Sequence, residues 1–312
     1  MKYFKHIAWC VVLLVVTVAT LFSQAFVDKG YHPKTTALGH SSIAMKEDAA
    51  LLFYNPASIG FENSAQVFAG FTQLYPYVAD DNLNVLNTGA TYSIGSFGTA
   101  GIGFSQFAPN FWSERSIIAS FASRTLLDNL SLGISVKLLL WSAESPQGEY
   151  AVPEPALSYT GMSFDVGALF LLPEIFEMND LQFAFALNDV TQPSISNSGN
   201  GTQLPLQITA GFAFLSHLYD YTIYGSSKTK GGDTKVSVGY ELSALKTTTF
   251  GIESELIVRI GMGRIMNNDT QGDYSGGFGL SIDNLTVDYS YSYQVAVRHV
   301  GGISSVALSY DF

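Results

Sequence analysis

Residues 285–295 alternate between apolar and polar side chains at every position. The apolar positions are Leu285, Val287, Tyr289, Tyr291, Tyr293 and Val295, and the polar positions between them are Thr286, Asp288, Ser290, Ser292 and Gln294. Successive side chains of a β-strand point to opposite faces, so this pattern predicts a strand with one apolar and one polar face. The alternation returns at the end of the chain, where Val306, Leu308, Tyr310 and Phe312 share one face.

The composition narrows the class of protein that these strands can build. Hydrophobic residues make up 47% of the 312 residues and charged residues only 13%, about half the charged share of a soluble protein. The only apolar run long enough to span a bilayer as a helix is at the N-terminus. An apolar chain without further helical spans is either a large soluble β protein or a membrane barrel.

About fourteen segments from Ala65 onward are alternating or rich in β-forming residues, each near the ~9–11 residues that a tilted membrane strand needs. They are residues 65–75, 84–94, 98–107, 115–124, 130–141, 160–170, 181–188, 206–215, 219–226, 234–242, 249–260, 274–283, 285–294 and 303–312. We expect an all-β fold, an antiparallel transmembrane β-barrel of about 14 strands over residues 65–312. A terminal strand that ends on an aromatic residue is typical of such barrels in the bacterial outer membrane. This resemblance implies the barrel-assembly machinery, which reads such strands, as a partner.

The connections between these segments alternate in length. Long, polar connections follow the odd-numbered segments at 76–83, 108–114, 142–159, 189–205 and 261–273, whereas short ones follow even-numbered segments at 95–97 and 283–284. Outer-membrane barrels have long loops outside and short turns in the periplasm, so both ends of the barrel are expected in the periplasm. Residues 171–180 are an exception, a longer periplasmic turn with room for a helical turn.

The alternation also assigns side chains to the two faces of the wall. We expect Phe250, Ile252, Leu256, Val258, Ile260, Phe278, Leu280 and Ile282 to face lipid. The lumen is expected to hold Glu253, Glu255, Arg259, Lys137, Asp165, Lys235, Glu241, Asp283 and Asp288. A charge on the lipid face costs ~2–4 kcal/mol at the membrane midplane, which favours this register over the opposite one.

Residues 1–25 have the features of a secretory signal peptide. Lys2 and Lys5 form a positive start, residues 7–19 are apolar, and Ser23-Gln24-Ala25 is a cleavage site of small residues, so we expect cleavage before Phe26. The alternative is an uncleaved membrane anchor. Cys10, the only cysteine, lies in this segment, so the mature chain would have no disulfide and no cysteine nucleophile or metal ligand. Its net charge of about −13 makes nucleic acid a poor partner.

Residues 26–64 do not alternate and are rich in small residues. Their spacing is compatible with a helix over residues 44–52 that ends before Pro56. We interpret this segment as a small plug packed inside the lumen, and the alternative is a loose periplasmic leader. The predicted organisation is therefore a signal peptide (1–25), a plug (26–64) and a barrel (65–312).

The run A-L-G-x-S-x-x-A-x-x-x-D-A-A-x-x-F-Y-N-P-A at residues 37–57 resembles the N-terminal signature of the FadL family, outer-membrane transporters of long-chain fatty acids and other hydrophobic compounds. It resembles equally the related PorV-type barrels of secretion systems. The resemblance implies a plug ahead of a fourteen-stranded barrel, with Asp48, Asn55, Pro56 and Ala57 in the plug. FadL-type barrels also kink their third strand to open a side gap, which implies a kink at Gly101 and Gly103. Paired glycines weaken a strand, although glycine is abundant throughout this chain.

No residue pattern here points to catalysis, a cofactor or a metal site. The histidines are scattered without metal-binding spacing, and Glu253, Glu255 and Arg259 fit a mutually paired lumen lining better than an acid–base pair. We therefore expect a channel for passive uptake of long-chain fatty acids or similar molecules, with release through the side gap. Its capture site would be formed by Phe107, Phe111, Trp112, Trp141 and Tyr150. An aromatic belt at the membrane interface would explain the presence of these residues equally well.

The alternative function is a PorV-like barrel that serves protein secretion or surface attachment, without small-molecule transport. A continuous apolar tunnel that ends near residues 101–103 would favour transport. A sealed lumen filled by charged pairs would favour the secretion hypothesis.

Overall fold

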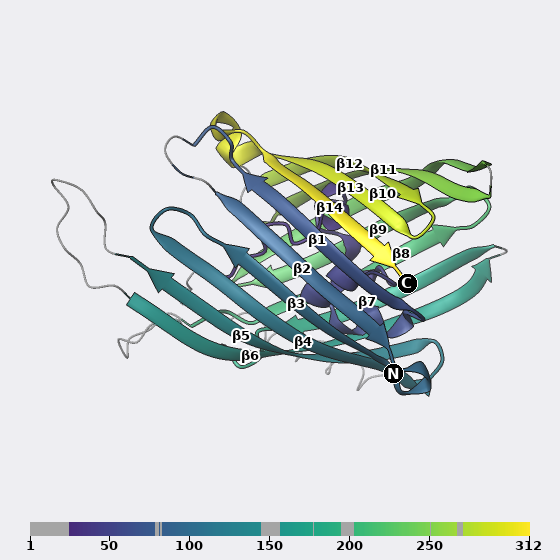
Figure 1. The fold of residues 1–312 in the computed structure, drawn as a ribbon, viewed down its shortest axis with the longest axis horizontal. Helices are drawn as coiled ribbons and strands as arrows, with labels where there is room; N and C mark the ends of the chain where they lie inside the picture. The colour runs from purple at the N-terminus through teal and green to yellow at the C-terminus, as the bar shows by residue number, and fades with distance from the viewer. Residues whose placement is uncertain are drawn as a thin grey trace, which may run out of the picture.

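The computed structural model describes residues 25–78, 81, 83–144, 157–176, 178–194, 203–249, 251–266 and 271–312. Within them, fourteen antiparallel strands form one closed barrel (Figure 1). The strands are β1 (Ala65–Leu74), β2 (Asn84–Ser93), β3 (Thr99–Phe107), β4 (Trp112–Leu127), β5 (Leu130–Ala143), β6 (Leu157–Phe176), β7 (Asn179–Asn188), β8 (Gln207–Ser216), β9 (Tyr221–Lys230), β10 (Asp233–Thr249), β11 (Ile252–Ile265), β12 (Gly272–Ile282), β13 (Leu285–Gln294) and β14 (Ile303–Asp311). The predicted fourteen-stranded barrel is confirmed, and every predicted segment overlaps one strand.

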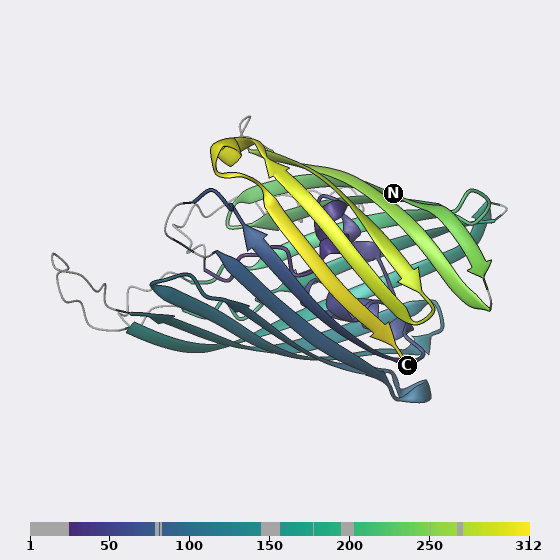
Figure 2. The same ribbon diagram turned by 45° about the horizontal axis from the view of Figure 1, so that its top comes forward.

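The first and last strands close the wall. β1 pairs with β14 from Gln66↔Asp311 to Leu74↔Ile303, and each remaining strand pairs with its neighbours in sequence. Closure satisfies the backbone groups that an open sheet edge would expose, which is the condition for crossing a bilayer with strands. All strands are steeply tilted relative to the barrel axis (Figure 2).

The two faces of the wall follow the predicted alternation. On β13, Tyr289, Tyr291 and Tyr293 are exposed, whereas Asp288 and Ser290 are completely buried. The exposed set predicted to face lipid includes Ile252, Val258, Ile260, Phe278, Leu280 and Ile282; Leu256 is half-buried and Phe250 lies outside the described residues. Asp283 departs from the prediction, because it lies exposed in the β12–β13 turn with φ 51° rather than in the lumen.

The connections sort by length as predicted, with three differences. The connection between β3 and β4, predicted to be long, has only the four residues 108–111 and is shorter than residues 94–98 between β2 and β3. Gly231 and Gly232 form a two-residue turn between β9 and β10, on the side that otherwise has the long loops, and both have positive φ values. In residues 171–176 and 178–180, which the structure describes, the expected longer turn contains no helical turn. β6 instead continues to Phe176 across a shift of register, and the Glu174 N–H donates to Asp180 Oδ1 at 3.0 Å.

Residues 26–64 lie inside the barrel (Figures 1 and 2). They form α2 (Pro33–Ala37) and three short 3₁₀ helices, η1 (Ser42–Ala44), η2 (Ala49–Phe53) and η3 (Pro56–Phe61). The helix expected over 44–52 is thus two separate turns, because the backbone is extended at Met45 and Asp48. The four elements touch different sectors of the wall: α2 lies on β11–β14, η1 on β7–β9, η2 on β1–β4 and η3 on β3–β6.

Two glycines of the wall allow this inner segment to approach closely. A Cβ at Gly133 would lie 2.4 Å from Ala57 N, and one at Gly261 would lie 2.1 Å from the carbonyl carbon of Leu38. Backbone therefore rests directly on backbone at both positions, which only glycine permits. Within the described part of the chain, no helix has the length and apolar character needed to cross a membrane.

Candidate functional site: the barrel lumen

Asn55 holds three parts of the lumen together. Its side-chain Oδ1 accepts the Ala57 N–H at 3.0 Å and caps η3, while Nδ2 donates to the carbonyls of Ile43 at 3.3 Å and Ala168 at 3.4 Å. An asparagine offers both a donor and an acceptor, so one fully buried side chain joins η3, η1 and β6. Pro56 begins η3 at the position that needs no N–H donor. Ala57 presents its carbonyl to the Ser131 hydroxyl at 2.7 Å.

Asp48 caps the N-terminus of η2, as Asn55 caps that of η3. Its Oδ1 accepts the Ala50 N–H at 2.9 Å, and its Oδ2 lies 2.5 Å from Lys34 Nζ. Burial alone would raise the pKa of Asp48, but the charges of Lys34 and His32 and the Ala50 N–H hold that pKa well below its usual range. Asp48, Asn55, Pro56 and Ala57 therefore shape the inner segment, and hydrogen bonds of Asn55 and Ala57 attach it to the wall.

Gly101 and Gly103 face the inner segment on β3. A Cβ at Gly103 would lie 2.7 Å from Leu52 Cδ1 and 2.8 Å from Phe53 Cζ, so the missing side chain makes room for these two residues. β3 pairs without interruption with β2, from Val85↔Phe107 to Ser93↔Thr99, and with β4, from Thr99↔Ala122 to Phe107↔Glu114. Backbone pairing thus closes the wall at these glycines in this structure, and the kink that the resemblance implied there stays a prediction.

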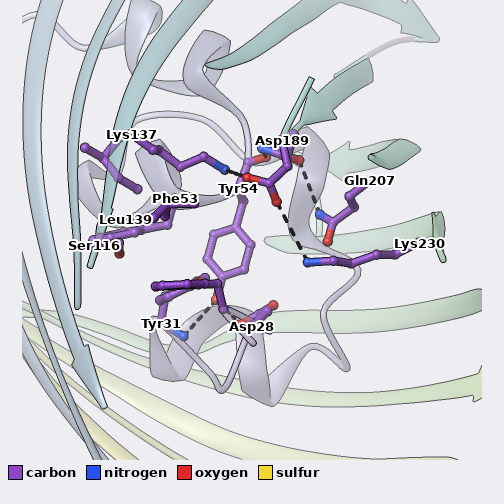
Figure 3. Close-up of a pocket in the computed structure, with 13 residues that line it drawn as sticks. Asp28, Tyr31, Phe53, Tyr54, Ser116, Lys137, Leu139, Asp189, Gln207 and Lys230 are labelled. Atoms are coloured by element: carbon purple, nitrogen blue, oxygen red, sulfur yellow. Dashed lines mark hydrogen bonds and ion pairs between the residues drawn. The ribbon is translucent and has the colours of Figure 1, made fainter. Parts of the chain in front are cut away.

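Buried charged side chains form two groups in the lumen, one around Asp189 and one around Asp28. Lys137 Nζ is 2.8 Å from Asp165 Oδ1 and also contacts Asp189, and Lys230 Nζ approaches Asp189 from the opposite side at 3.8 Å (Figure 3). Asp28 forms a second centre, with His40 Nδ1 at 3.2 Å and Lys228 Nζ at 3.7 Å. Pairing lowers the cost of burying these charges, and it fills the lumen with polar groups.

Two small cavities remain between these charges and the apolar side chains. The first, of ≈ 40 Å³, has an apolar wall of Phe26, Phe53, Ile118 and Leu139 and a rim of mixed charge, with Lys137 and Lys230 beside Asp28 and Asp189. Figure 3 shows both lysines and both carboxylates at this cavity. The second, of ≈ 20 Å³, is bordered by Phe26, Lys29, Val85, Phe107 and Glu114. A water molecule needs about 10–15 Å³ of such space, so the cavities hold a few waters and no long ligand. Neither of these two cavities is a continuous apolar tunnel.

A row of aromatic side chains adjoins the second cavity at the end of the barrel that carries the long loops, called here the outer mouth. Glu114 on β4 is the register partner of both Phe107 on β3 and Trp141 on β5, and Trp141 is the partner of Tyr159 on β6. Register partners point to the same face, and Phe107 and Glu114 are buried, so this row faces the interior. Trp112 adds an edge-to-face contact with Phe107 at 6.1 Å.

Three of the five aromatics predicted from the sequence therefore gather on one interior surface. Phe111 lies beside them in the loop and is 52% exposed, and Tyr150 lies outside the described residues. Sequence reasoning missed Glu114 and Tyr159. The alternation of β4 and β6 would have placed both on the interior face, but only strand register brings them into one row.

The group of Glu253, Glu255 and Arg259 does not form. Arg259 pairs with Glu241 at 2.5 Å, Glu255 lies 3.7 Å from Lys246, and Glu253 is exposed near the β10–β11 turn. Residues four apart on one strand are separated by about 13 Å, so a strand residue finds its partner across strands rather than along its own. In the described ranges, no three His, Cys, Asp or Glu side chains are grouped to hold a metal ion.

Solved structures provide the comparison for this barrel. The Pseudomonas putida toluene transporter TodX is similar over 93% of this chain and 99% of that chain, with a TM-score of 0.60 and 13% identity. The Ralstonia pickettii toluene transporter TbuX is similar over 92% and 100%, with a TM-score of 0.58 and 14% identity. This chain has the FadL-type fold. A Pseudomonas aeruginosa FadL homologue also matches, over 90% and 98%, with a TM-score of 0.56 and 13% identity.

The fold also indicates the cellular compartment of the protein. A closed barrel of this type with an apolar exterior belongs to the bacterial outer membrane. No protein-family model matches the sequence, and no curated protein matches it. At identities of 13–14% the structural likeness concerns the fold alone.

Proposed function

We propose that the protein is a channel for passive uptake of small hydrophobic or amphipathic molecules across the outer membrane, with long-chain fatty acids as the substrate class. The observation that carries this proposal is the interior aromatic row at the outer mouth, next to cavities that combine an apolar wall with lysines. Phe107 and Glu114 belong both to the row and to the second cavity, and Phe26 lines both cavities. The aromatic surface and the amphipathic cavity are therefore contiguous.

The chemistry of this region matches a fatty acid. Each buried CH₂ group of the tail contributes ~0.8 kcal/mol, so a long chain on an aromatic surface binds firmly. The carboxylate would be bound by Lys230, whose ammonium is 3.8 Å from Asp189 and so makes no direct hydrogen bond to it. Transport needs no energy source beyond partitioning of the ligand into the membrane.

Passage requires the inner segment to move, because the cavities hold only a few waters. Leu52 and Phe53 fill the space above Gly101 and Gly103, so their withdrawal would clear the interior surface of β3. Release sideways through the wall at this place is the route that we propose. It requires local separation of β3 from a neighbour, since its pairing is unbroken in this structure.

Tryptophan fluorescence offers a direct test. Trp9 lies in the predicted signal peptide, so the mature protein would contain only Trp112 and Trp141, both at the outer mouth. We expect a brominated octadecanoic acid to quench this fluorescence saturably and more strongly than a brominated phospholipid at the same mole fraction. Lipid extraction and mass spectrometry of the detergent-purified protein should also recover a fatty acid. Equal quenching by both probes, with no ligand recovered, would contradict the proposal.

One observation favours a second candidate, a barrel for protein secretion or surface attachment. Among the described residues, charged pairs occupy the lumen and neither interior cavity opens into an apolar tunnel, which is the arrangement expected for that function. It predicts a protein that co-purifies after crosslinking in intact cells, and unchanged fatty-acid uptake by cells that lack the barrel. Reduced uptake in those cells would instead support the channel.

A further inference from the structure

The backbone nitrogen of Phe26 lies inside the barrel, against a buried carboxylate. It is 3.0 Å from Glu114 Oε2, and Lys29 Nζ reaches the same oxygen at 2.5 Å. Glu114 is only 8% exposed, and Phe26 lines both interior cavities. The first residue after the predicted signal peptide is thus held at one fixed place in the lumen.

We propose that the mature protein begins at Phe26 and that Glu114 binds the free α-ammonium group of this residue. Hydrolysis of the Ala25–Phe26 bond by a signal peptidase consumes one water, leaving a carboxylate on Ala25 and an ammonium on Phe26. The single amide N–H that faces Glu114 becomes a cation with three donors, which makes a stronger, charge-assisted contact. The carboxylate then has two cations, the α-ammonium and Lys29.

The position of Phe26 supports cleavage at this bond. Residues that line the same cavity come from the interior faces of β4, β5 and β9, including Ser116, Leu139 and Lys230. A leader that remained attached would have to enter the membrane from the interior of a closed barrel whose lumen the inner segment already occupies. Release of the leader before the barrel closes avoids this conflict.

The first test locates the start of the chain. The full-length gene is expressed with its own leader, and the folded protein from the outer membrane is analysed by intact mass and N-terminal sequencing. We expect Phe26 as the first residue. A chain that begins at any other residue would overturn the proposal.

The second test measures how strongly Glu114 binds the ammonium. A carboxylate partner raises the pKa of an α-amino group, and each unit of increase slows its acylation at pH 7 about tenfold. We expect Glu114→Gln to label at the α-amine at least about tenfold faster than the wild type, as read by mass spectrometry of the N-terminal peptide. Glu253→Gln, which removes an exposed carboxylate at the other end of the barrel, should label at the wild-type rate. Equal rates for wild type and Glu114→Gln would overturn the assignment of Glu114.

A third variant keeps the assignment testable if Glu114→Gln does not fold. Insertion of Gly-Ser between Ala25 and Phe26 retains the cleavage site but moves the ammonium up to about 7 Å along the chain. We expect this protein to migrate as a folded, heat-modifiable barrel and to label at the faster rate. Slow labelling in a folded insertion variant would show that general burial, not Glu114, protects the amine.

Discussion

Arg259 Nη1 lies 2.5 Å from Asp288 Oδ1, although the two residues belong to strands that are not neighbours. β12 lies between them, and a Cβ at Gly279 of that strand would come within 2.9 Å of both atoms. The same guanidinium donates from Nε to Glu241 on β10 at 2.5 Å. One buried cation on β11 therefore joins β10 and β13 by ion pairs, and its contact with β13 passes over a glycine of β12.

Removal of this cation should destabilise the barrel strongly. Arg259→Met leaves two carboxylates in the lumen without their partner, a change that typically costs about 3–5 kcal/mol. Equilibrium unfolding by urea in detergent or lipid should show the loss. Lys246→Met is the matched control, because its ion pair is half exposed and worth at most about 1 kcal/mol. The triple variant with Glu241→Gln and Asp288→Asn should recover much of the loss, and failure to recover would point to packing instead.

An alanine at Gly133 should loosen the inner segment without harming the wall. Its Cβ would overlap the backbone at Pro56 and Ala57, and overpacking of this kind costs about 1–3 kcal/mol. Hydrogen exchange of a peptide that covers residues 50–61 should become faster. Gly70→Ala serves as control, since its Cβ faces the same interior with nothing nearer than 3.5 Å. Unchanged exchange in Gly133→Ala would contradict the close approach.

Glu62 should make the stability of the protein fall as pH rises. Burial raises the pKa of this carboxyl from 4.5 to about 8 against a hydrogen bond from Thr91, and the charges of Asp48, Asp311 and Glu47 add to the increase. Between pH 4.5 and about pH 8, Glu62 keeps its proton in the folded state and has lost it in the unfolded state. The free energy of unfolding therefore decreases with pH across this window, by up to about 1.4 kcal/mol per unit.

The variant Glu62→Gln should remove this dependence, because an amide accepts the Thr91 hydrogen bond and does not ionise. Unfolding measured at several values from pH 4.5 to 8 should show a shallower slope and higher stability at pH 8 than in the wild type. Glu253→Gln, at an exposed carboxyl, should keep the wild-type slope. An unchanged slope in Glu62→Gln would assign the dependence to another group.

Truncation of the aromatic row should weaken binding of the proposed ligand. Trp141→Ala removes a large apolar surface from the outer mouth, and we expect about a tenfold increase in the Kd of a long-chain fatty acid, or about 1.4 kcal/mol. Binding can be followed by quenching of the remaining Trp112. Tyr92→Ala, which removes an exposed aromatic from β2, should leave the Kd unchanged. Equal affinities in both variants would exclude the row as the capture surface.

The alternation of side chains was sufficient to predict the barrel. β13 and β14 show why: their polar faces, with Asp288 and Ser305, are buried in the structure, and their aromatic faces are exposed. A period of two is a local property that survives any arrangement of the strands, so the number of strands and the face of each residue could be derived from the sequence. Strand ends were less predictable, because hairpins such as β6–β7 extend beyond the alternating core.

The sequence could not predict which side chains meet in the lumen, because these contacts join distant parts of the chain. The sequence placed Arg259 inside but grouped it with Glu253 and Glu255 on its own strand, whereas the structure pairs it with Glu241 on β10 and Asp288 on β13. The family resemblance implied a kink at Gly101 and Gly103, and only the structure shows that Leu52 and Phe53 pack against Gly103. Strand periodicity determines which face a residue occupies. Only closure of the barrel determines its neighbours, because register, shear and the packed inner segment bring together residues that no spacing along the chain connects.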